Sequence, residues 1–322
     1  MKKVFVTGAT GLLGTHVMIK LLKDGYFVTA LVRKKSDYLD KKNENLKFVE
    51  GDRSTDVSSY LREIDVIVHI AAETRQNLIH YEEYRTVNYD FTVNLLTQAE
   101  LSGVKKFIFI SSANTLGYGS REDSGHEEKP QQYPFTVSLY AQSKLEAENY
   151  LLKNAQNTEV VILNPTFMIG AFDNKPSSGK IIFWAWKKKW IFYPKGGKNF
   201  VHAEDVADGV VKAIQKGKNR EKYVLANDDL SYKEFFTKIN KITHQNPMMI
   251  PIPNILLNVL GRLGDGMRRF KIKTNLSSVN MKALQVFNYY SNQKSKDELG
   301  MHYQSTDKAI ADAIEYFEKK ET

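Results

Sequence analysis

The sequence contains no cysteine, which excludes disulfide bonds, zinc–thiolate sites and cysteine nucleophiles and fits a reducing compartment. Long hydrophobic runs are also absent. The apolar N-terminal run 4–6 stops at Thr7, far short of a secretory signal core. The later stretch 252–263 is interrupted by a proline, two asparagines and an arginine, and it falls short of the roughly 20 apolar residues that span a bilayer. We therefore expect a cytoplasmic protein without a membrane span.

The remaining composition is that of an ordinary globular protein. Of 322 residues, 42% are hydrophobic and 26% charged, and the formal net charge is +9. The basic residues form only short, scattered clusters, such as Lys34-Lys35 and Lys187-Lys188-Lys189. A nucleic-acid-binding protein would concentrate such residues on one face or along one helix. We therefore predict solvated lysines with some attraction for small anionic molecules, and no nucleic-acid partner.

The first half alternates short apolar runs with amphipathic stretches, a pattern typical of parallel strands joined by crossover helices. Strands are predicted at Lys3–Thr7, Phe27–Val32, Leu46–Glu50, Val66–Ile70, Phe107–Ser111 and Val160–Leu163. Helices are predicted at Leu12–Lys23, Tyr81–Leu101 and Thr136–Asn154. This order predicts an α/β fold with a doubly wound parallel sheet.

A second, smaller lobe is predicted from a change of character after Asn164-Pro165. Residues 166–199 read as loops around one helix. The chain then returns to the first domain with a strand at 200–202, a helix at 204–216 and a strand at 223–225, and it is mostly helical from Ser231 onward. We predict one domain from residues 1–165 plus about 200–228. A mostly helical C-terminal lobe would comprise about 166–199 plus 229–322, with the substrate between the two.

A glycine-rich turn follows the first predicted strand and opens the first helix. Gly8, Gly11 and Gly14 would serve a tight turn, room for a pyrophosphate and close helix packing, respectively. The free N–H groups at the start of the helix would bind phosphate. The predicted cofactor-binding residues in this segment are Gly8, Thr10, Gly11, Leu12, Leu13 and Gly14.

The residues after the second strand favour NADP over NAD. NAD-specific turns carry an acid about 20 residues beyond the glycines, to bond the ribose 2′-hydroxyl. Here the chain reads Val32-Arg33-Lys34-Lys35, and Arg33 can hold a 2′-phosphate with a fork of donors. A solvated basic turn is the alternative. Asp52, after the third strand, suits the adenine edge of the cofactor or an ordinary turn.

Tyr140 and Lys144 are four residues apart in a predicted helix and lie on the same face. An ammonium beside a phenol favours the phenolate and makes the tyrosine a usable acid or base. The spacing also arises by chance, so its context matters. Ser111-Ser112 ends the fifth strand, where a hydroxyl could hydrogen-bond a substrate oxygen while Tyr140 transfers its proton.

These segments together resemble the extended short-chain dehydrogenase/reductase family. The resemblance rests on Thr7–Gly14, His69-Ile70-Ala71-Ala72, Ser111-Ser112-Ala113, Tyr140–Lys144, Asn164-Pro165-Thr166, Phe200–Ala207 and Glu298-Leu299-Gly300, and so covers nearly the whole chain. It implies a Rossmann domain, a catalytic set of Ser112, Tyr140 and Lys144, a cofactor lined by Ala71 and Ala72 and held also by Tyr140 and Lys144, and a homodimer through the helices at 81–101 and 136–154.

Three positions carry open alternatives within the resemblance. Ser111 takes the role of Ser112 if the alignment is displaced by one residue. Asn88 matches an asparagine common in the family, and it is equally well explained as a structural amide inside a helix. His202 resembles a residue that packs between the lobes, and we expect it to be structural.

Two enzyme classes and one non-enzymatic class compete. A dihydroflavonol-reductase-like, NADPH-dependent reductase would act on an aldehyde, ketone or secondary alcohol, and we favour it. A nucleotide-sugar epimerase or dehydratase with bound NAD usually carries arginines where this chain has Asn164 and Lys198, although Glu127 and Glu128 match epimerase acids. A non-catalytic NADP-binding regulator would not keep Ser112, Tyr140 and Lys144 together.

Two apolar segments lie outside these motifs. The aromatic stretch 183–193 suits either a pocket wall for a hydrophobic or aromatic substrate or the core of the second lobe. The segment 255–270 alternates leucines with arginines and suits a membrane surface or a cover for the active site, but we favour a helix packed on the second lobe.

Overall fold

Seven short apolar segments form one parallel sheet at the centre of the molecule. The computed structural model describes residues 2–35, 43–174 and 176–321. The strands are β1 (Lys3–Thr7), β2 (Phe27–Val32), β3 (Leu46–Glu50), β4 (Val66–His69), β5 (Lys106–Ile110), β6 (Glu159–Pro165) and β10 (Lys222–Leu225). Their order is β10-β6-β5-β4-β1-β2-β3, with all pairs parallel. The predicted doubly wound α/β fold is confirmed, and the strand order reverses between β1 and β4, where such sheets bind ligands.

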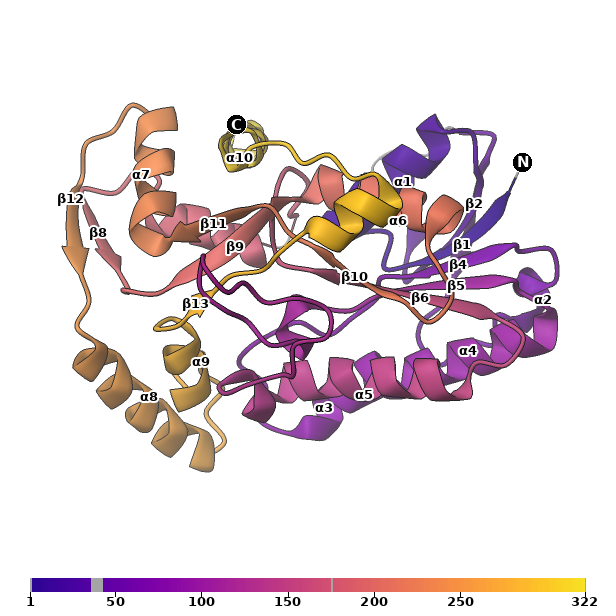
Figure 1. Cartoon of the computed structure of the whole chain (residues 1–322), viewed down its shortest axis with the longest axis horizontal. Coiled ribbons are helices and arrows are strands. Elements are labelled where there is room, and N and C mark those ends of the chain that lie inside the picture. Colours follow the sequence, from indigo (N-terminus) through magenta and orange to yellow (C-terminus); the bar gives the residue numbers. More distant parts are fainter. Residues whose placement is uncertain (1, 36–42, 175, 322) are drawn as a thin grey trace.

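Helices cover both faces of this sheet (Figure 1). On one face, α1 (Leu12–Lys23) packs against α6 (Ala203–Lys216) over a core that includes Val6, Val17 and Val210. The other face carries α2 (Ser58–Leu61), α3 (Tyr81–Arg85), α4 (Phe91–Ser102) and α5 (Leu139–Asn154) over a second core. A π-helical turn, Thr86–Asp90, joins α3 to α4, so the predicted helix at 81–101 is a chain of three helical segments.

The C-terminal lobe is mostly helical, as predicted, and it also contains two small sheets. Its helices are α7 (Tyr232–Ile242), α8 (Asn254–Arg269), α9 (Ser278–Ala283) and α10 (Thr306–Glu321). One sheet has β9 (Gly197–His202) between β11 (Asp228–Ser231) and β13 (Phe287–Asn288), and β7 (Phe167–Ile169) also pairs with β9. The other pairs β8 (Trp190–Tyr193) with β12 (Met248–Pro251). Most of these strands have two to four residues, too few for periodicity to reveal them.

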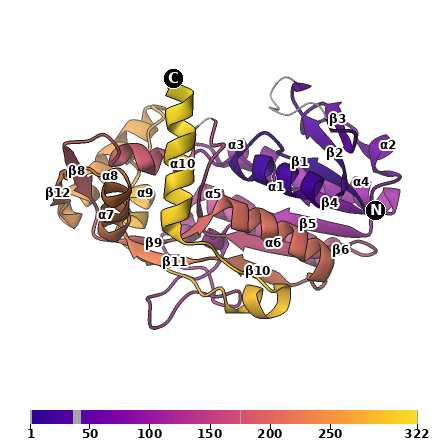
Figure 2. The same cartoon turned by 90° about the horizontal axis from the view of Figure 1, so that it is seen from above.

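A third apolar core stabilises this lobe. The rings of Phe200 and Phe235 stack with centroids 4.1 Å apart, and Ile182, Trp186 and Phe317 pack in the same cluster. Seen from above, α10 stands between the β8–β12 end of the molecule and the large sheet (Figure 2). The helix predicted within 166–199 is a 3₁₀ turn at Ser178–Trp184.

Segments from the C-terminal half of the chain pack into the core of the large sheet. The predicted domain boundaries stay a prediction. The strand expected to return to the first domain at 200–202 belongs to β9 in the smaller sheet, although Val201 packs into the core beneath α1 and α6. Leu299 and Met301, which follow β13 in the chain, pack into that same core.

Candidate functional site

The turn between β1 and α1 is packed so closely that two of its glycines have no room for a side chain. Gly8 has a φ of +76°, and a Cβ there would lie 2.6 Å from the Ala71 nitrogen. A Cβ at Gly14 would lie 2.0 Å from the Gly8 oxygen. Both positions need glycine because backbone atoms occupy the space, which brings the start of α1 against the sheet.

Gly11 differs from these two. A Cβ there would have one neighbour, the Gly8 oxygen at 3.6 Å, which is an ordinary contact. Its backbone is extended, with φ −85° and ψ 174°, a conformation open to any residue. Packing within the protein therefore does not require glycine here, whereas a phosphate group close to the backbone would.

The start of α1 is suited to an anion. Gly11 is the N-cap and offers no side-chain cap, and the first turn has no acidic residue. The N–H groups of a first helical turn lack intrahelical partners, and the helix dipole adds positive potential. Leu12 and Leu13 have buried side chains, so contact with a cofactor would come from their backbone, whereas Thr10 is half-buried. These features fit the pyrophosphate of a dinucleotide.

A chain of hydrogen bonds from β1 to α4 orients the backbone at Ala71. The Ala71 N–H donates to Thr7 Oγ1 (3.2 Å), and the Thr7 hydroxyl hydrogen-bonds His69 Nδ1 (2.7 Å). His69 Nε2 then donates to Thr92 Oγ1 (3.0 Å), which donates to the Asn88 carbonyl (2.8 Å). Burial, followed by the nearby Lys144, lowers the pKa of His69 to about 3, so the ring stays neutral. Ala71 and Ala72 are half-buried beside the glycine turn.

Arg33 and Asp52 lie at the carboxyl ends of neighbouring strands. Arg33 follows β2 and is exposed, so its guanidinium is accessible to a ligand. Asp52 follows β3, and its Oδ1 accepts hydrogen bonds from the Ser54 N–H and hydroxyl. These bonds hold the pKa of Asp52 below its ordinary value. Asp52 therefore shapes a turn, and its role at the adenine edge of the cofactor stays a prediction.

Ser112 and Tyr140 are brought together above the carboxyl end of β5. Ser112 Oγ accepts from the Asn114 N–H (3.2 Å). Burial raises the pKa of Tyr140 to about 12, opposed by a hydrogen bond with the Ser112 side chain. The phenol is therefore protonated at neutral pH. The expected lowering of its pKa by Lys144 is absent here, because burial dominates and because Lys144 bonds elsewhere.

Lys144 is fully buried beneath this pair. Its Nζ donates to the Ile110 carbonyl (2.7 Å) and lies 4.5 Å from the centre of the Phe109 ring. Burial lowers the pKa of Lys144 to about 7, and the carboxylate of Glu148 opposes this shift. Lys144 is thus buried next to the carboxyl end of β5, with its ammonium on the Ile110 carbonyl.

Glu148, one helical turn after Lys144, is the centre of a buried network that the sequence analysis missed. Its carboxylate accepts from the Ser111 hydroxyl, from Thr115 Oγ1 (2.7 Å) and from Asn164 Nδ2 (2.7 Å), and it pairs with Lys222 (2.5 Å). Ser111 is therefore occupied inside the protein, whereas Ser112 is half-exposed. The geometry selects Ser112 over Ser111. The i, i+4 spacing from Lys144 was the available signal for Glu148.

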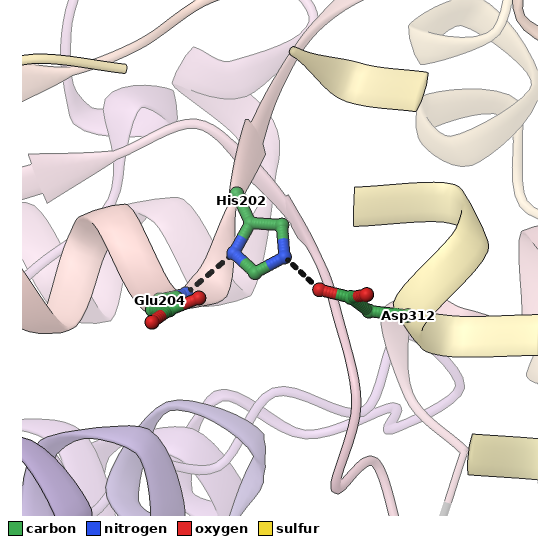
Figure 3. Close-up of side chains that lie close together, drawn as sticks. All are labelled: His202, Glu204 and Asp312. Atoms are coloured by element: carbon green, nitrogen blue, oxygen red, sulfur yellow. Dashed lines mark hydrogen bonds and ion pairs between the residues drawn. The ribbon is translucent and has the colours of Figure 1, made fainter. Parts of the chain in front are cut away.

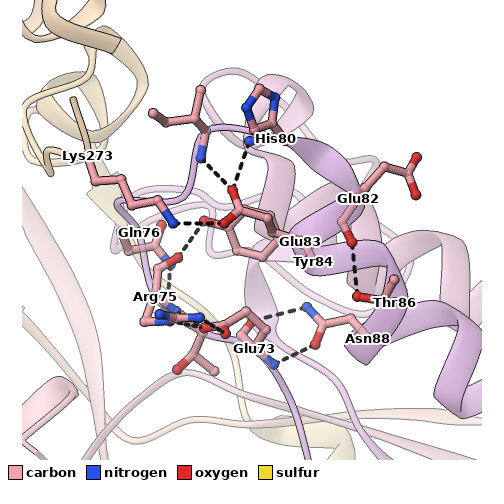
Figure 4. A network of polar contacts seen from close by, with 12 residues as sticks. Glu73, Arg75, Gln76, His80, Glu82, Glu83, Tyr84, Thr86, Asn88 and Lys273 are labelled. Atoms are coloured by element: carbon pink, nitrogen blue, oxygen red, sulfur yellow. Dashed lines mark hydrogen bonds and ion pairs between the residues drawn. The ribbon is translucent and has the colours of Figure 1, made fainter. Parts of the chain in front are cut away.

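Asn88 ties the segment after β4 to the helix that carries Tyr140. Its Oδ1 accepts from the Glu73 N–H (2.8 Å), and its Nδ2 donates to the Glu73 carbonyl (3.1 Å) and to Ser143 Oγ (2.9 Å). Figure 4 shows Asn88 and Glu73 facing one another beside Arg75. Asn88 is fully buried in the π-helical turn. This placement fits the structural alternative, and Asn88 links the segment after β4 to α5 through Ser143.

His202 joins the two lobes. It is the N-cap of α6, where its Nδ1 accepts from the Glu204 N–H (3.0 Å), and its Nε2 hydrogen-bonds Asp312 of α10 (3.0 Å; Figure 3). The ligand atoms of these three side chains lie within 4.8 Å of one another, a spacing that a metal ion could bridge. Both imidazole nitrogens are already engaged, in agreement with the structural role expected for His202.

The C-terminal lobe reaches the catalytic loop through the segment around β13. Tyr290 donates from its hydroxyl to the Ala113 carbonyl (2.8 Å), and Asn288 Nδ2 lies 3.5 Å from Asn114 Oδ1. Asn288 is in register with Lys198 of β9. Residues of the C-terminal segment therefore adjoin the loop that directly follows Ser112.

Known proteins resemble the chain over most of its length. The model of the NAD dependent epimerase/dehydratase family matches residues 4–226. A Synechocystis protein provisionally assigned as a dihydroflavonol 4-reductase is 29% identical, covering 98% of this chain and 94% of its own. The Dictyostelium discoideum sterol-4-alpha-carboxylate 3-dehydrogenase (decarboxylating) is 28% identical over 79% and 81% of the two chains. The UDP-glucose 4-epimerase of Vibrio cholerae is 31% identical over 81% and 82%.

Among solved structures, that of gox2253 has a TM-score of 0.84 and 27% identity, and it covers 99% of both chains. The sequence relatives include oxidoreductases and epimerases, which share a fold and differ in reaction. The choice among these reactions depends on the site itself.

Proposed function

Because the chain belongs to the NAD dependent epimerase/dehydratase family, the extended short-chain dehydrogenases/reductases, we propose that it is an NADPH-dependent reductase of a hydrophobic aldehyde or ketone. The observation that carries this proposal is the geometry of the site, in which the Tyr140 phenol hydrogen-bonds the Ser112 side chain close to the buried Lys144. A protonated tyrosine is prepared to give a proton, as carbonyl reduction requires.

The roles of the side chains follow from their positions. When bound, the reduced nicotinamide supplies the hydride that the carbonyl carbon accepts. The Ser112 hydroxyl donates a hydrogen bond to the substrate oxygen, which stabilises its developing negative charge. Tyr140 gives that oxygen its proton, so the carbonyl gains one hydride and one proton and becomes an alcohol. In this structure the Lys144 ammonium donates to the Ile110 carbonyl, so it would have to turn toward Tyr140 to favour the phenolate that remains.

Arg33 supports NADPH as the preferred cofactor. It is an exposed guanidinium at the end of β2, where an NAD-specific site would place an acid. A 2′-phosphate there would gain a bidentate partner in the guanidinium.

The proposal of a hydrophobic substrate is supported by the residues at positions where nucleotide-sugar enzymes bind the diphosphate. Asn164 is buried, and its amide donates to Glu148 and Thr115 Oγ1 (3.0 Å), so this position offers no cation to a nucleotide sugar. The carboxylate of Glu127 is occupied by the Val224 N–H (2.8 Å). The relatives named as a dihydroflavonol reductase and a sterol dehydrogenase point the same way.

A nucleotide-sugar epimerase or dehydratase with tightly held NAD is the second candidate, favoured by the 31% identity to a UDP-glucose 4-epimerase. A purified epimerase would carry NAD and convert a UDP-sugar without net consumption of cofactor. A regulator without turnover would bind NADPH and oxidise none of it with any carbonyl.

The deciding experiment follows NADPH and NADH oxidation with a panel of aromatic aldehydes, hydrophobic ketones and nucleotide sugars. Replacing Tyr140 by Phe should lower kcat at least about 100-fold and leave NADPH affinity unchanged. Tyr150→Phe, on the same helix, is the matched control and should keep the parental rate. A Y140F protein that reduced carbonyls at the parental rate would refute the proposed mechanism.

A further inference from the structure

Helix α8 presents an apolar stripe to solvent and buries glycines. Ile255, Leu263 and Phe270 are 77%, 60% and 82% exposed. With a rotation of 100° per residue, the exposed apolar side chains cover one continuous third of the helix circumference. They are Ile255, Leu256, Val259, Leu263, Met267 and, at its C-cap, Phe270, and we call them the α8 stripe.

The inward face of α8 explains why the stripe points outward. A Cβ at Gly264 would lie 1.1 Å from the Leu276 oxygen, and one at Gly261 would lie 2.8 Å from the Ser278 Cα. Backbone of the segment that leads into α9 therefore packs directly against this side of the helix. Only Leu257 of the large apolar side chains of α8 is buried among the described residues. Because the inner side has no space for large side chains, the large apolar residues lie on the outer side of the helix.

The helix is also held rigidly, so the stripe is a preformed surface. The Asp265 carboxylate accepts from the Ser278 N–H (3.0 Å), and the Arg268 guanidinium donates to the Thr274 carbonyl (3.0 Å) and to the Gln76 carbonyl (2.7 Å). Lys273 pairs with Glu83 of α3 at 3.0 Å, as Figure 4 shows. The helix is thereby attached to the segment that follows Ala72 at the cofactor edge.

Basic residues border the stripe. The segment 254–273 contains five lysines and arginines and one acid. Arg262, Arg269 and Lys271 are exposed, and on the helix the two arginines lie along one edge of the stripe. An apolar face with flanking cations is the pattern of helices that lie in the interface of an anionic membrane.

A second group of exposed apolar side chains lies at the same end of the molecule. Figures 1 and 2 both place β8, β12 and α8 there, and residues 252–253 connect β12 to α8. Trp190 and Phe192 of β8 are each 56% exposed, and Met248, in register with Trp190, is 57% exposed. Tryptophan is enriched at membrane–water interfaces. The lysines at 187–189 directly precede β8 and are exposed.

We propose that the α8 stripe docks on the surface of an anionic lipid bilayer, with α8 lying in the plane of the interface. In the described part of the chain, no helix is both long and apolar enough to cross a bilayer. A second copy of the chain fits this face less well, because a two-fold contact would bring Arg262, Arg269 and Lys271 of both copies together. The segment after Ala72, to which α8 is attached, would place the cofactor edge of the sheet near a source of hydrophobic substrate, a consequence that rests on the proposed function.

The test is flotation of the full-length protein with phosphatidylcholine vesicles that contain or lack phosphatidylglycerol. We expect binding to the anionic vesicles that falls as salt is raised. The double variant Leu263→Glu/Phe270→Glu should bind at least about tenfold less, because both exposed side chains would carry charge. The matched control is Leu101→Glu, which alters an 83% exposed leucine of α4 and should bind like the parent. Arg262→Gln/Arg269→Gln should weaken binding and its salt dependence.

Two results would overturn the proposal: no binding of the parent to anionic vesicles, or equal binding of L263E/F270E and the parent. A concentration-dependent dimer that L263E/F270E abolishes would assign the stripe to a second copy instead. Thermal unfolding monitored by circular dichroism confirms that each variant is folded. Because flotation needs neither cofactor nor turnover, this result is independent of the proposed reductase activity.

Discussion

Replacing Gly11 and Gly14 separately by alanine should affect two different quantities: the free energy of unfolding at Gly14 and NADPH affinity at Gly11. At Gly14 the new Cβ would lie 2.0 Å from a backbone oxygen that cannot move without shifting β1 or α1. We expect a loss of about 3 to 5 kcal/mol in the free energy of unfolding, as for the most disruptive point mutations. At Gly11 the Cβ would meet one atom at 3.6 Å, in a backbone conformation that alanine adopts freely.

The expected change in stability for Gly11→Ala is therefore small. Alanine is a poorer N-cap than glycine and lowers the free energy of unfolding by roughly 1 kcal/mol. It also makes the unfolded chain less flexible, which raises the free energy of unfolding by about 0.4 to 1 kcal/mol. The added methyl group would, however, occupy space next to the unpaired N–H groups that begin α1. We expect NADPH affinity to fall at least about tenfold, or about 1.4 kcal/mol.

Urea unfolding gives the first quantity, and fluorescence titration with NADPH gives the second. The reasoning fails if G11A binds NADPH as tightly as the parent, because the missing side chain at Gly11 would then serve no ligand. It also fails if G11A and G14A lose equal stability. A G14A protein too unstable to purify is compared through its soluble yield with that of G11A.

The remaining predictions concern charge and the buried amide. Arg33→Glu should weaken NADPH binding about 30-fold and leave NADH binding nearly unchanged in parallel titrations, since only NADPH has a 2′-phosphate; equal losses for both would contradict this role. The lowering of the Lys144 pKa from 10.5 to about 7 means that burial disfavours its charged form by about 5 kcal/mol. Lys144→Met should abolish turnover. It should also raise the free energy of unfolding by about 2 kcal/mol, because the removed cost of burying the charge exceeds the loss of the hydrogen bond to Ile110. A K144M protein less stable than the parent would refute this expectation. The unfolded chain keeps the lysine proton up to its ordinary pKa and the folded chain only to about 7, so parental stability should rise between pH 7 and 10 in urea titrations, and K144M should lack this rise. Asn88→Ala leaves the Glu73 backbone groups without their partners and should cost about 2 to 3 kcal/mol by urea unfolding; a loss within experimental error would exclude Asn88 as a positioning residue.

Local patterns in the sequence were enough for the large sheet and its cofactor edge. Three of the predicted strands, β1, β2 and β3, and the helix α1 have the bounds observed, because short apolar runs and an amphipathic stretch are separated there by glycines and charged residues. Tyr140 and Lys144 were identifiable because four residues along a helix return to the same face. The preference for NADPH and the identity of the substrate stay predictions.

Contacts between distant segments decided the rest. The choice of Ser112 over Ser111 depends on Glu148, a residue 37 positions away that binds Ser111. The raised pKa of Tyr140 and the lowered pKa of Lys144 come from burial, which the spacing of the two residues does not reveal. The segment 255–270 was predicted as a helix packed on the second lobe, and α8 does pack on α9, but it does so through Gly261 and Gly264, so the large apolar side chains remain exposed. Periodicity determines which residues share a face of a helix, whereas the space left by the neighbouring backbone determines which face is buried.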